Sequence, residues 1–501
     1  MARPRGHCGA IGWSSGMVWC FMKALQTWIG VLLVLGFVAT SQAAIELPDL
    51  GLSADRVLSP AQERAVGRAY VNQLRSQNQV IDLPILDEYI NDLGYRLVFS
   101  AGSSSAFSFF VTQDTSINAF ALPGGYVGVN AGLILAARNV DEMAGVLAHE
   151  ITHVTQRHVA RAIESMQGRQ LATLAAALGA VLATGGNGDV IGGALSAAMA
   201  SLAQGQIQYT YANEEEADRL GIMLLQRAGF DPMGMPLFFE RLMQSSRYYE
   251  NEYSDFLRDH PVTSARIAEA KERVAAMGVT RARSVPHSTE QFAMIQALVM
   301  TMVTPYDEAV LSFKTRLASN PNDLGARFGL GWLLADHREG AQAVHLLTPL
   351  LRRYATLPIM YLSMAQAQTS AQQPAAALES YRKALLIFPD DYPLALAQAQ
   401  LLVAQDRPAE ARAKLLALPV RYQDKPELMR TLAEANAAMG NRVESHYYLS
   451  EYYLLSGQAE QAMEQLRVAL VQKENDDFNK MRAKARLSEI EKALKEAKKF
   501  R

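Results

Sequence analysis

The sequence predicts a mostly α-helical chain, with a small β-sheet in its first half and a helical solenoid in its second. Three observations support this fold class. Apolar residues recur at helical spacing over 140–164, two short strands flank a Pro-Gly-Gly turn within 118–130, and a 34-residue period follows residue 300. The 501 residues include 48 basic and 50 acidic side chains. Because the charges nearly balance, we expect no nucleic-acid partner.

Residues 1–43 have the pattern of a secretory signal peptide. Lys23 precedes an apolar run from Trp28 to Ala39, and small residues surround Ser41-Gln42-Ala43, after which we expect cleavage. The run is short for a membrane span, although an uncleaved anchor is the alternative. The residues before Met22 are unusual for a signal, so Met22 is the preferred start. Cleavage would also remove both cysteines of the chain, which suits an oxidising compartment.

The remaining chain is expected to form two units. We place the first over 44–280, a linker over 281–288 and the second over 289–501, because the linker is basic, polar and interrupted by Pro286. Within the first unit, residues 171–204 are rich in Ala and Gly and predict two apolar helical pieces around a turn. These pieces form either a mobile lid or a helical hairpin packed in the core.

The second unit repeats every 34 residues. The same place in successive copies is occupied by Tyr306, Gly340, Pro374, Pro408 and Arg442, and small residues follow three positions later. The copy from Pro374 to Pro389 matches the second helix of a tetratricopeptide repeat. We therefore predict an α-solenoid of four to six such repeats, an unrelated helical array being the alternative. The basic segment after Lys480 predicts a solvated capping helix or a patch for acidic partners.

The helix predicted over 140–164 contains the sequence His149-Glu150-Ile151-Thr152-His153. Residues four apart lie on one face of a helix, so both imidazoles can bind one metal ion. Glu150 is offset by about 100° and can reach a water bound to that ion. Zinc lowers the pKa of such a water toward about 7, and a neighbouring carboxylate can take its proton. A helix with two surface histidines is the alternative.

A zinc hydrolase of this type needs a third protein ligand and an open fourth position. The candidate is Glu214, at the start of a helix that we predict to run to about Ala228. Asp218 lies four residues later on the same face, where it can accept a hydrogen bond from a ligand imidazole. An acidic helix start favoured by the macrodipole is the alternative. The sequence therefore predicts one zinc ion per chain, held by His149, His153 and Glu214.

With these motifs the chain resembles the zinc peptidases that include the CAAX prenyl protease and the heat-shock membrane protease. That family combines H-E-x-x-H with a later Glu four residues before an Asp, which falls here on Glu214. The resemblance implies a zincin-type metallopeptidase domain. It also implies that Asn118, Ala119 and Phe120 lie on the strand beside the cleft that pairs with the substrate backbone. An ordinary core hairpin is the other interpretation of that segment.

The resemblance also implies catalytic roles for His260 and Arg266. In similar proteins the histidine lies on a loop over the metal, where it either fills the fourth zinc position and keeps the enzyme inactive or stabilises the oxyanion. Arg266 is a second candidate for stabilising the oxyanion. A surface histidine before a proline is the alternative. On a continuous helix His158 would face away from the metal, nine residues after His149, so it is left out.

The order of signal, peptidase and repeats resembles periplasmic members of the family in Gram-negative bacteria. The resemblance implies a periplasmic zinc endopeptidase and chaperone, exported through a cleavable signal, that degrades misfolded or stalled outer-membrane barrel proteins. Unfolded outer-membrane proteins are then its substrates, the repeats contact the barrel assembly machinery, and peripheral membrane contact is expected. Glu150 would be the general base and then the proton donor. The alternative is mainly a tetratricopeptide scaffold or chaperone with a latent zinc site.

Overall fold

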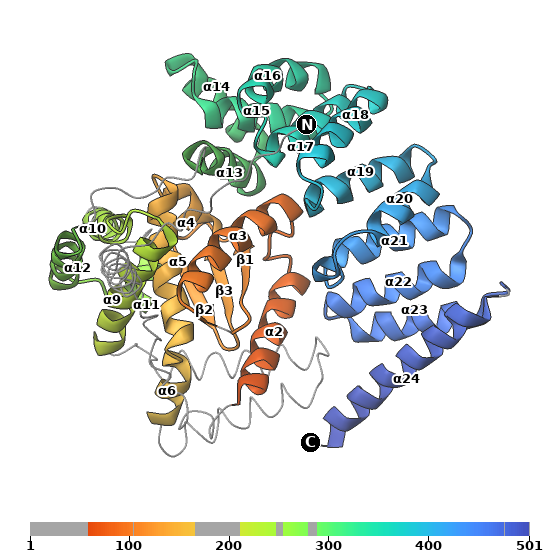
Figure 1. The fold of residues 1–501 in the computed structure, drawn as a ribbon, viewed down its shortest axis with the longest axis horizontal. Coiled ribbons are helices and arrows are strands. Elements are labelled where there is room, and N and C mark those ends of the chain that lie inside the picture. The colour runs from red at the N-terminus through yellow and green to blue at the C-terminus, as the bar shows by residue number, and fades with distance from the viewer. Residues whose placement is uncertain are drawn as a thin grey trace, which may run out of the picture. The chain divides into compact units, whose positions relative to one another are not determined.

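The computed structural model describes residues 59–103, 105–165, 211–246, 254–278, 288–474 and 476–499 (Figure 1). These residues form a mostly helical structure, with a three-stranded sheet in the first half and successive helix pairs in the second. The fold class predicted from the sequence is confirmed. The predicted signal at 1–43, the Ala/Gly-rich segment at 171–204 and the linker residues 281–287 lie outside the described residues.

The sheet has the strand order β1-β3-β2. Strand β3 (Tyr126–Asn130) lies parallel to β1 (Ser108–Thr112) and antiparallel to β2 (Ala119–Leu122). The hairpin predicted around the Pro-Gly-Gly turn is therefore present. Gly124 and Gly125 have φ angles of 80° and 88°, a region that residues with a Cβ rarely adopt. A Cβ on Gly124 would also lie 2.3 Å from the Cα of Arg64 in α2, so backbone and packing both require glycine there.

Helix α5 (Val140–Thr155) is the centre of the peptidase half. It is buried on nearly all sides, between α3, α9, α10 and strand β2 (Figure 1). Its mostly apolar sequence suits such a position. The surrounding helices are α2 (Pro60–Ser76), α3 (Pro84–Ser100), α4 (Ala131–Ala136), α6 (His158–Ser165), α9 (Tyr211–Ala228), α10 (Gly234–Ser246), α11 (Ser254–Asp259) and α12 (Ser264–Ala276).

The helix predicted over 140–164 is interrupted, so that prediction is wrong in its second part. α5 ends at Thr155, α6 begins at His158, and Arg157 between them has a φ of 51°. A residue other than glycine is uncommon in this left-handed region and persists only where its surroundings hold it. Arg157 Nη2 donates a hydrogen bond to Glu63 Oε1 of α2 at 2.8 Å. A contact from a distant helix thus stabilises the break.

The second half is a row of helix pairs at the period that the sequence predicts. The helices between residues 288 and 499 are α13 (Ser288–Val303), α14 (Tyr306–Ser319), α15 (Leu324–Asp336), α16 (Gly340–Arg353), α17 (Pro358–Ser370), α18 (Pro374–Ile387), α19 (Tyr392–Ala404), α20 (Pro408–Leu416), α21 (Pro426–Ala438), α22 (Arg442–Leu455), α23 (Ala459–Val471) and α24 (Asp477–Lys499). In this described part of the chain, five packed pairs run from α15 with α16 to α23 with α24, and α13 packs mainly on α15 and α4. The number of packed pairs lies within the predicted four to six repeats.

The five residues that mark the 34-residue period are each the first residue of a helix, the second helix of a repeat. Helices α14, α16, α18, α20 and α22 each begin at one of the five positions that mark the period. Three residues into the first four of these helices, the side chain is a fully buried alanine in every case: Ala309, Ala343, Ala377 and Ala411. A methyl group at this place lets neighbouring helices approach closely. The predicted tetratricopeptide repeats are therefore confirmed.

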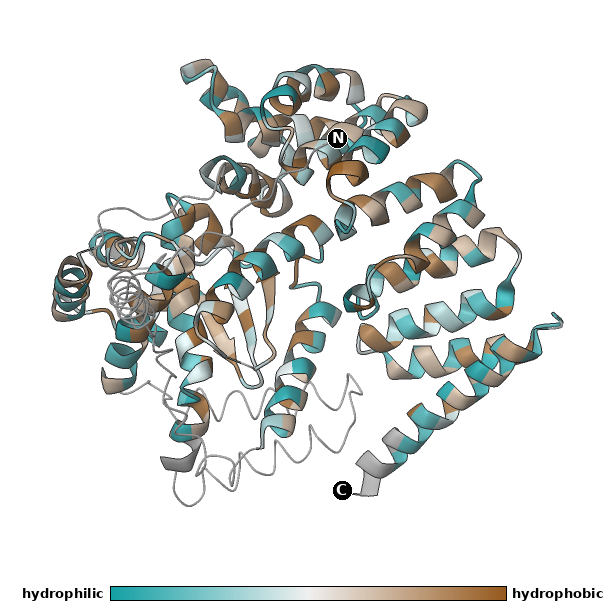
Figure 2. Ribbon diagram, in the orientation of Figure 1, coloured by the Kyte–Doolittle hydropathy of each residue, from teal (hydrophilic) through white to brown (hydrophobic). Residues whose placement is uncertain are grey.

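The two ends of the row differ in what covers them. At the first end, Gln296 of α13 donates from Nε2 to the carbonyl oxygens of Ile134 and Ala137, at 2.9 and 2.6 Å, beside α4 of the peptidase half. At the other end, α24 packs on α22 and α23 and buries Ala483 and Ile490. Figure 2 shows α24 as largely hydrophilic otherwise, which suits the solvated capping helix predicted there.

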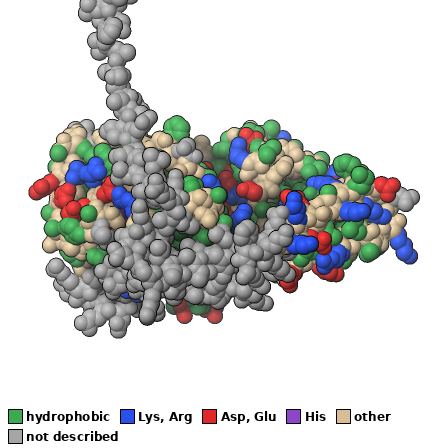
Figure 3. Space-filling view, turned by 90° about the horizontal axis from the view of Figure 1, so that it is seen from below, with side chains coloured by type: hydrophobic (Ala, Val, Ile, Leu, Met, Phe, Trp, Pro, Cys, Tyr) green, Lys and Arg blue, Asp and Glu red, His purple; other side chains and the backbone are tan. Residues whose placement is uncertain are grey.

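The described surface shows mixed charge. On the face drawn in Figure 3, basic and acidic side chains are interspersed over the repeats instead of being separated by sign. Within the described ranges, no helix combines the length and the hydropathy that crossing a membrane requires.

Replacing Ala377 by Leu should destabilise the repeats. The alanine methyl group is fully buried, and extra methylenes in a packed core cost about 1–3 kcal/mol. Thermal unfolding followed by circular dichroism should show a lower Tm. Ala375→Leu is the matched control because Ala375 is exposed on the same helix. Equal Tm values for the two variants would contradict this account of the packing.

Candidate metal centre

Helix α5 directs three ionisable side chains into the interior of the peptidase half. His149 and His153 leave the same face of the helix, and their ring centroids are 4.6 Å apart. Glu150 lies next to them, and all three side chains are buried. The helix begins at a cap, since the Asn139 side chain accepts a hydrogen bond from the Glu142 amide at 2.9 Å. Burying three such groups on one turn is costly and is typical of functional sites.

Helix α9 brings two carboxylates to the same face of α5. Glu214 and Asp218 are both buried. The two helices approach closely at Gly221, where a Cβ would lie 3.3 Å from the carbonyl carbon of Ala148 and from the amide nitrogen of His149. The Nδ1–H of His149 donates to Asp218 Oδ1 at 3.0 Å. This contact orients the ring so that Nε2 faces Glu214, and with a metal ion bound it would keep the Nε2 lone pair free for that ion.

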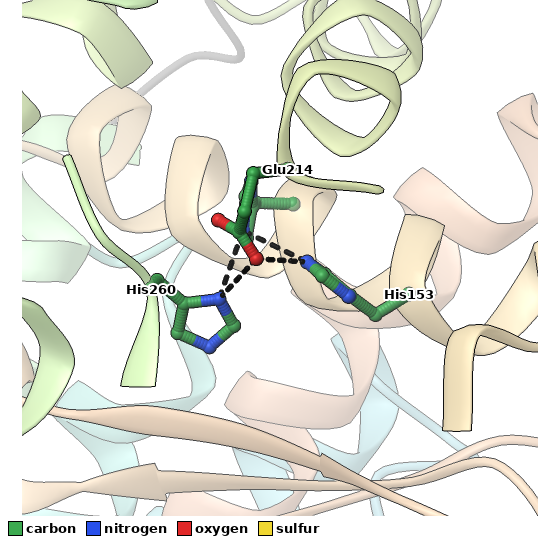
Figure 4. Close-up of side chains that lie close together, drawn as sticks. His153, Glu214 and His260 are labelled. Carbon is green, nitrogen blue, oxygen red and sulfur yellow. Dashed lines mark hydrogen bonds and ion pairs between the residues drawn. The ribbon is translucent and has the colours of Figure 1, made fainter. Parts of the chain in front are cut away.

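Four buried side chains converge on one point, and one ligand atom of each lies within 4.8 Å of the others: His149, His153, Glu214 and His260. From His149 Nε2 the distance is 3.0 Å to His153 Nε2 and 3.5 Å to Glu214 Oε2. His260 Nδ1 lies 3.3 Å from His149 Nε2 and 3.1 Å from Glu214 Oε1 (Figure 4). Ligands about 2.1 Å from a tetrahedral zinc ion are about 3.4 Å apart. These residues therefore fit a metal ion in both chemistry and spacing.

The charges around this cluster favour a cation. Burial favours a neutral ring, yet hydrogen bonds to Asp218 and Glu214 raise the pKa of His149 to about 10. Burial opposes ionisation of Glu214, yet the neighbouring His260 and His149 hold the pKa of its carboxyl well below its usual range. The carboxylates thus draw positive charge to the rings. A divalent ion would supply that charge and leave the imidazoles neutral, as ligation requires.

Glu150 lies beside the cluster and is fully buried. Within the described part of the chain, neither of its carboxylate oxygens accepts a hydrogen bond, although His260 Nε2 lies 3.4 Å from Oε1. Burial raises the pKa of Glu150 above its usual range. A carboxylate with free oxygens and increased proton affinity, next to a metal-sized cluster, has the properties of a general base.

The loop between α11 and α12 supplies His260, and α12 supplies Arg266 behind the cluster. The Arg266 guanidinium donates to both oxygens of Asp218, at 2.8 and 2.9 Å, and to the carbonyl oxygen of Pro261 at 2.7 Å. Its Nη1 also lies 2.9 Å from Glu214 Oε2. The structure thus brings Arg266 to the site, but these contacts hold the two carboxylates and the His260 loop. The oxyanion roles considered for His260 and Arg266 stay predictions.

Strand β2 lies at an edge of the sheet, close to the loop that carries His260. Ala119 and Phe120 pair with β3 on one side, and among the described strands nothing pairs with the other side. Asn118, just before β2, donates from Nδ2 to Asp259 Oδ2 at 3.2 Å, and Asp259 precedes His260 in the chain. An edge strand in this position can pair with the backbone of an extended peptide.

Comparison with known proteins adds a family to this geometry. Residues 84–274 match peptidase family M48. The chain is 33% identical over 462 residues to the beta-barrel assembly-enhancing protease of Yersinia pestis. That match covers 91% of this chain and 93% of the relative. The chain is also 33% identical over 465 residues to the protein of the same name from Escherichia coli K12, with coverage of 90% and 92%. The chain belongs to peptidase family M48.

Peptidases of family M48 are metal-dependent, so this M48 chain is a metalloprotease with tetratricopeptide repeats. Among solved structures, a thermophilic TPR protein from Thermus thermophilus is 20% identical and has a TM-score of 0.24. The match covers 40% of this chain and 99% of that chain.

The M48 site contains one residue that the sequence analysis left out. The prediction that His158 faces away is wrong because α5 ends before it. Its ring is fully buried, with Nδ1 2.9 Å from His153 Nδ1 and Nε2 3.2 Å from Glu216 Oε2. Burial lowers the pKa of His158 to about 4, so the ring is neutral at pH 7. Three histidines within ten residues were the available signal, and the assumption of a continuous helix concealed it.

Asp218→Asn should weaken metal binding by this M48 peptidase about 10–100-fold. The neutral amide would hold the Nδ1–H of His149 less strongly and would lose its ion pair with Arg266. Competition with a chelator measures the affinity. Glu215→Gln is the matched control, since it removes a carboxylate of the same helix from outside the cluster. Unchanged affinity in Asp218→Asn would exclude the orienting role of Asp218.

Proposed function

We propose that the protein is a periplasmic zinc-dependent endopeptidase that degrades misfolded or stalled outer-membrane barrel proteins and aids barrel assembly. The observation that carries the proposal is the convergence of His149, His153 and Glu214 beside the free carboxylate of Glu150. The names of the relatives support the choice of substrates. The signal peptide predicted over 1–43 supports the periplasmic location.

Zinc is the proposed ion, with one ion per chain. Imidazole nitrogens together with a single carboxylate are typical ligands of catalytic zinc, whereas magnesium and calcium prefer sites made of oxygen atoms. Zinc bound at this position would lower the pKa of a water molecule and polarise the scissile carbonyl.

The chain's own groups would position the substrate and move the protons. The open edge of β2, with Asn118, Ala119 and Phe120, would hold an extended substrate through main-chain hydrogen bonds. Such pairing places little demand on sequence, which suits unfolded proteins. Glu150 would take a proton from the attacking water and deliver it to the leaving amine. Asp218 would keep His149 in the tautomer with a free Nε2.

His260 gives the proposed enzyme a latent state. Its Nδ1 lies at the distances from His149 and Glu214 that are expected of a fourth ligand. A fourth protein ligand would take the place of the hydrolytic water, so this arrangement is inactive. Movement of the His260 ring would free that position, and the displaced imidazole would then be able to stabilise the oxyanion.

A second candidate function is a tetratricopeptide scaffold or chaperone with a latent zinc site. The contacts of His260 with the cluster favour this candidate because a closed site must open before it cleaves anything. The concave face of a repeat array suits extended partners. We propose that the repeat domain, 289–501, contacts the barrel assembly machinery and that the peptidase domain, 44–280, is joined to it through 281–288. Peripheral contact with a membrane remains part of this proposal.

Glu150→Gln should keep the zinc and lose the peptidase activity. The amide cannot accept the proton of the attacking water, so cleavage of an unfolded outer-membrane protein should fall about 10²–10⁴-fold. Metal analysis of the purified protein should still find zinc, whereas His149→Ala should lose both zinc and activity. Wild-type cleavage by Glu150→Gln would remove Glu150 from the mechanism. Full rescue by this variant of the barrel-assembly defect of a deletion strain would instead favour the scaffold function.

His260→Ala should increase cleavage several-fold while the zinc content stays unchanged. The reason is that removing the imidazole opens the fourth position of the cluster. Initial rates on the same unfolded substrate measure the effect, and His345→Ala, at an exposed site in the repeats, is the control. A loss of activity with zinc retained would assign His260 to oxyanion stabilisation and remove the latent state.

A further inference from the structure

The candidate ligand His153 faces the cluster with Nε2, and its other ring nitrogen, Nδ1, makes a separate contact. Its Nδ1 lies 2.9 Å from Nδ1 of His158, whose Nε2 lies 3.2 Å from Oε2 of Glu216. Arg161 Nη2 donates to the same carboxylate oxygen at 2.8 Å. Both histidine side chains are buried. A line of hydrogen-bonding groups therefore runs from the cluster to an ion pair between α6 and α9.

The carboxylate fixes the direction of these hydrogen bonds. Glu216 is paired with the Arg161 guanidinium, and an ionised carboxylate only accepts hydrogen bonds, so Nε2 of His158 is the donor. A neutral imidazole has one N–H, so Nδ1 of His158 is an acceptor and Nδ1 of His153 donates to it. His153 then presents the lone pair of Nε2 to the cluster, which is the form that binds a metal.

The opposite direction is unfavourable at the Glu216 end of the line and incompatible with metal binding at the other. It would turn a lone pair of His158 Nε2 toward the negative oxygen of Glu216 at 3.2 Å. It would also place the proton of His153 on Nε2, the nitrogen that lies 3.5 Å from Glu214 Oε1 within the cluster. That tautomer could not bind the ion.

The break between α5 and α6 makes the contact between the two histidines possible. On an unbroken helix His158 would be about 140° around the axis from His153. Instead α5 ends at Thr155, and Arg157 adopts a φ of 51° while its side chain bonds Glu63. Residues held in such sparsely populated regions occur preferentially at functional sites.

We propose that His158 is a positioning residue which, with Glu216 and Arg161, holds His153 in the tautomer and orientation that bind the metal. The inference rests on the proposed zinc site and extends it to the second histidine ligand. His149 is oriented by direct contact with the Asp218 carboxylate at 3.0 Å. His153 is oriented through an intervening imidazole, so the two ligands of one helix depend on different carboxylates of α9.

Zinc affinity of the full chain, measured by chelator competition at neutral pH, tests this proposal. His158→Phe keeps a buried ring but removes both nitrogens, and it should weaken zinc binding about 10–100-fold. His158→Asn keeps an acceptor oxygen near the position of Nδ1 and should stay within a few-fold of the wild type. Equal zinc affinity in His158→Phe and the wild type would overturn the proposal. Equal losses of zinc affinity in His158→Phe and His158→Asn would overturn it too, because a hydrogen-bond acceptor at position 158 would then make no difference.

Thermal unfolding of the zinc-free proteins separates positioning from folding, and all three proteins should have similar Tm values. Should His158→Phe fail to fold, Glu216→Ala carries the test, with Glu215→Ala as its matched control on the same helix. The proposal is supported if Glu216→Ala loses zinc affinity and Glu215→Ala does not. It is rejected if the two variants bind zinc equally well. If the wild type itself bound no zinc, the proposed zinc site would be wrong. That result is distinct from one in which the wild type binds zinc and the His158 variants bind it equally well.

Discussion

The cost of burying carboxylates and imidazoles together is the constraint on which the peptidase half depends. An ionised carboxylate removed from water loses several kcal/mol unless a counter-charge and hydrogen bonds replace the solvent. Glu214 and Asp218 meet this requirement through Arg266 and the ring of His149. Glu150 accepts no hydrogen bond within the described residues and has only His260 Nε2 nearby, 3.4 Å from Oε1. This unequal compensation distinguishes Glu150, the proposed general base, from the other two carboxylates.

The same requirement explains the unusual backbone near the site. Gly221 allows α9 to approach α5 so closely that the acidic face of one helix meets the histidines of the other. Arg157 takes a strained conformation that turns His158 back toward His153. In the repeats, residues with positive φ recur with the 34-residue period instead, at Arg338, Gln372, Asp406 and Gly440 in the turns between paired helices, and a buried alanine at a fixed place joins one helix pair to the next. Stability in the repeats is therefore distributed, whereas the site depends on a few irreplaceable contacts.

This difference explains how much the sequence could predict. The repeats follow from a local pattern, and the five positions that mark their period are the starts of five helices. The meeting of His149, His153 and Glu214 follows from spacing on two helices. The helix break was not predictable in this way because it depends on Glu63, a residue 94 positions before Arg157, and because no glycine marks the positive φ. The contacts of Arg266 with Asp218 and Glu214 were not predicted for the same reason, since these partners lie on another helix.

Arg266 also limits how the site can open. One guanidinium holds Asp218, Glu214 and the carbonyl oxygen of Pro261, directly after His260. Moving the whole loop would break the hydrogen bond between the charged Arg266 and Pro261, and a bond of this kind contributes about 1.5–3 kcal/mol. Turning the His260 side chain alone would keep that bond, although the buried ring would have to leave its stack on Phe256. Opening by rotation of one imidazole therefore preserves the Arg266 contacts, and it leaves both carboxylates of α9 in place for the metal.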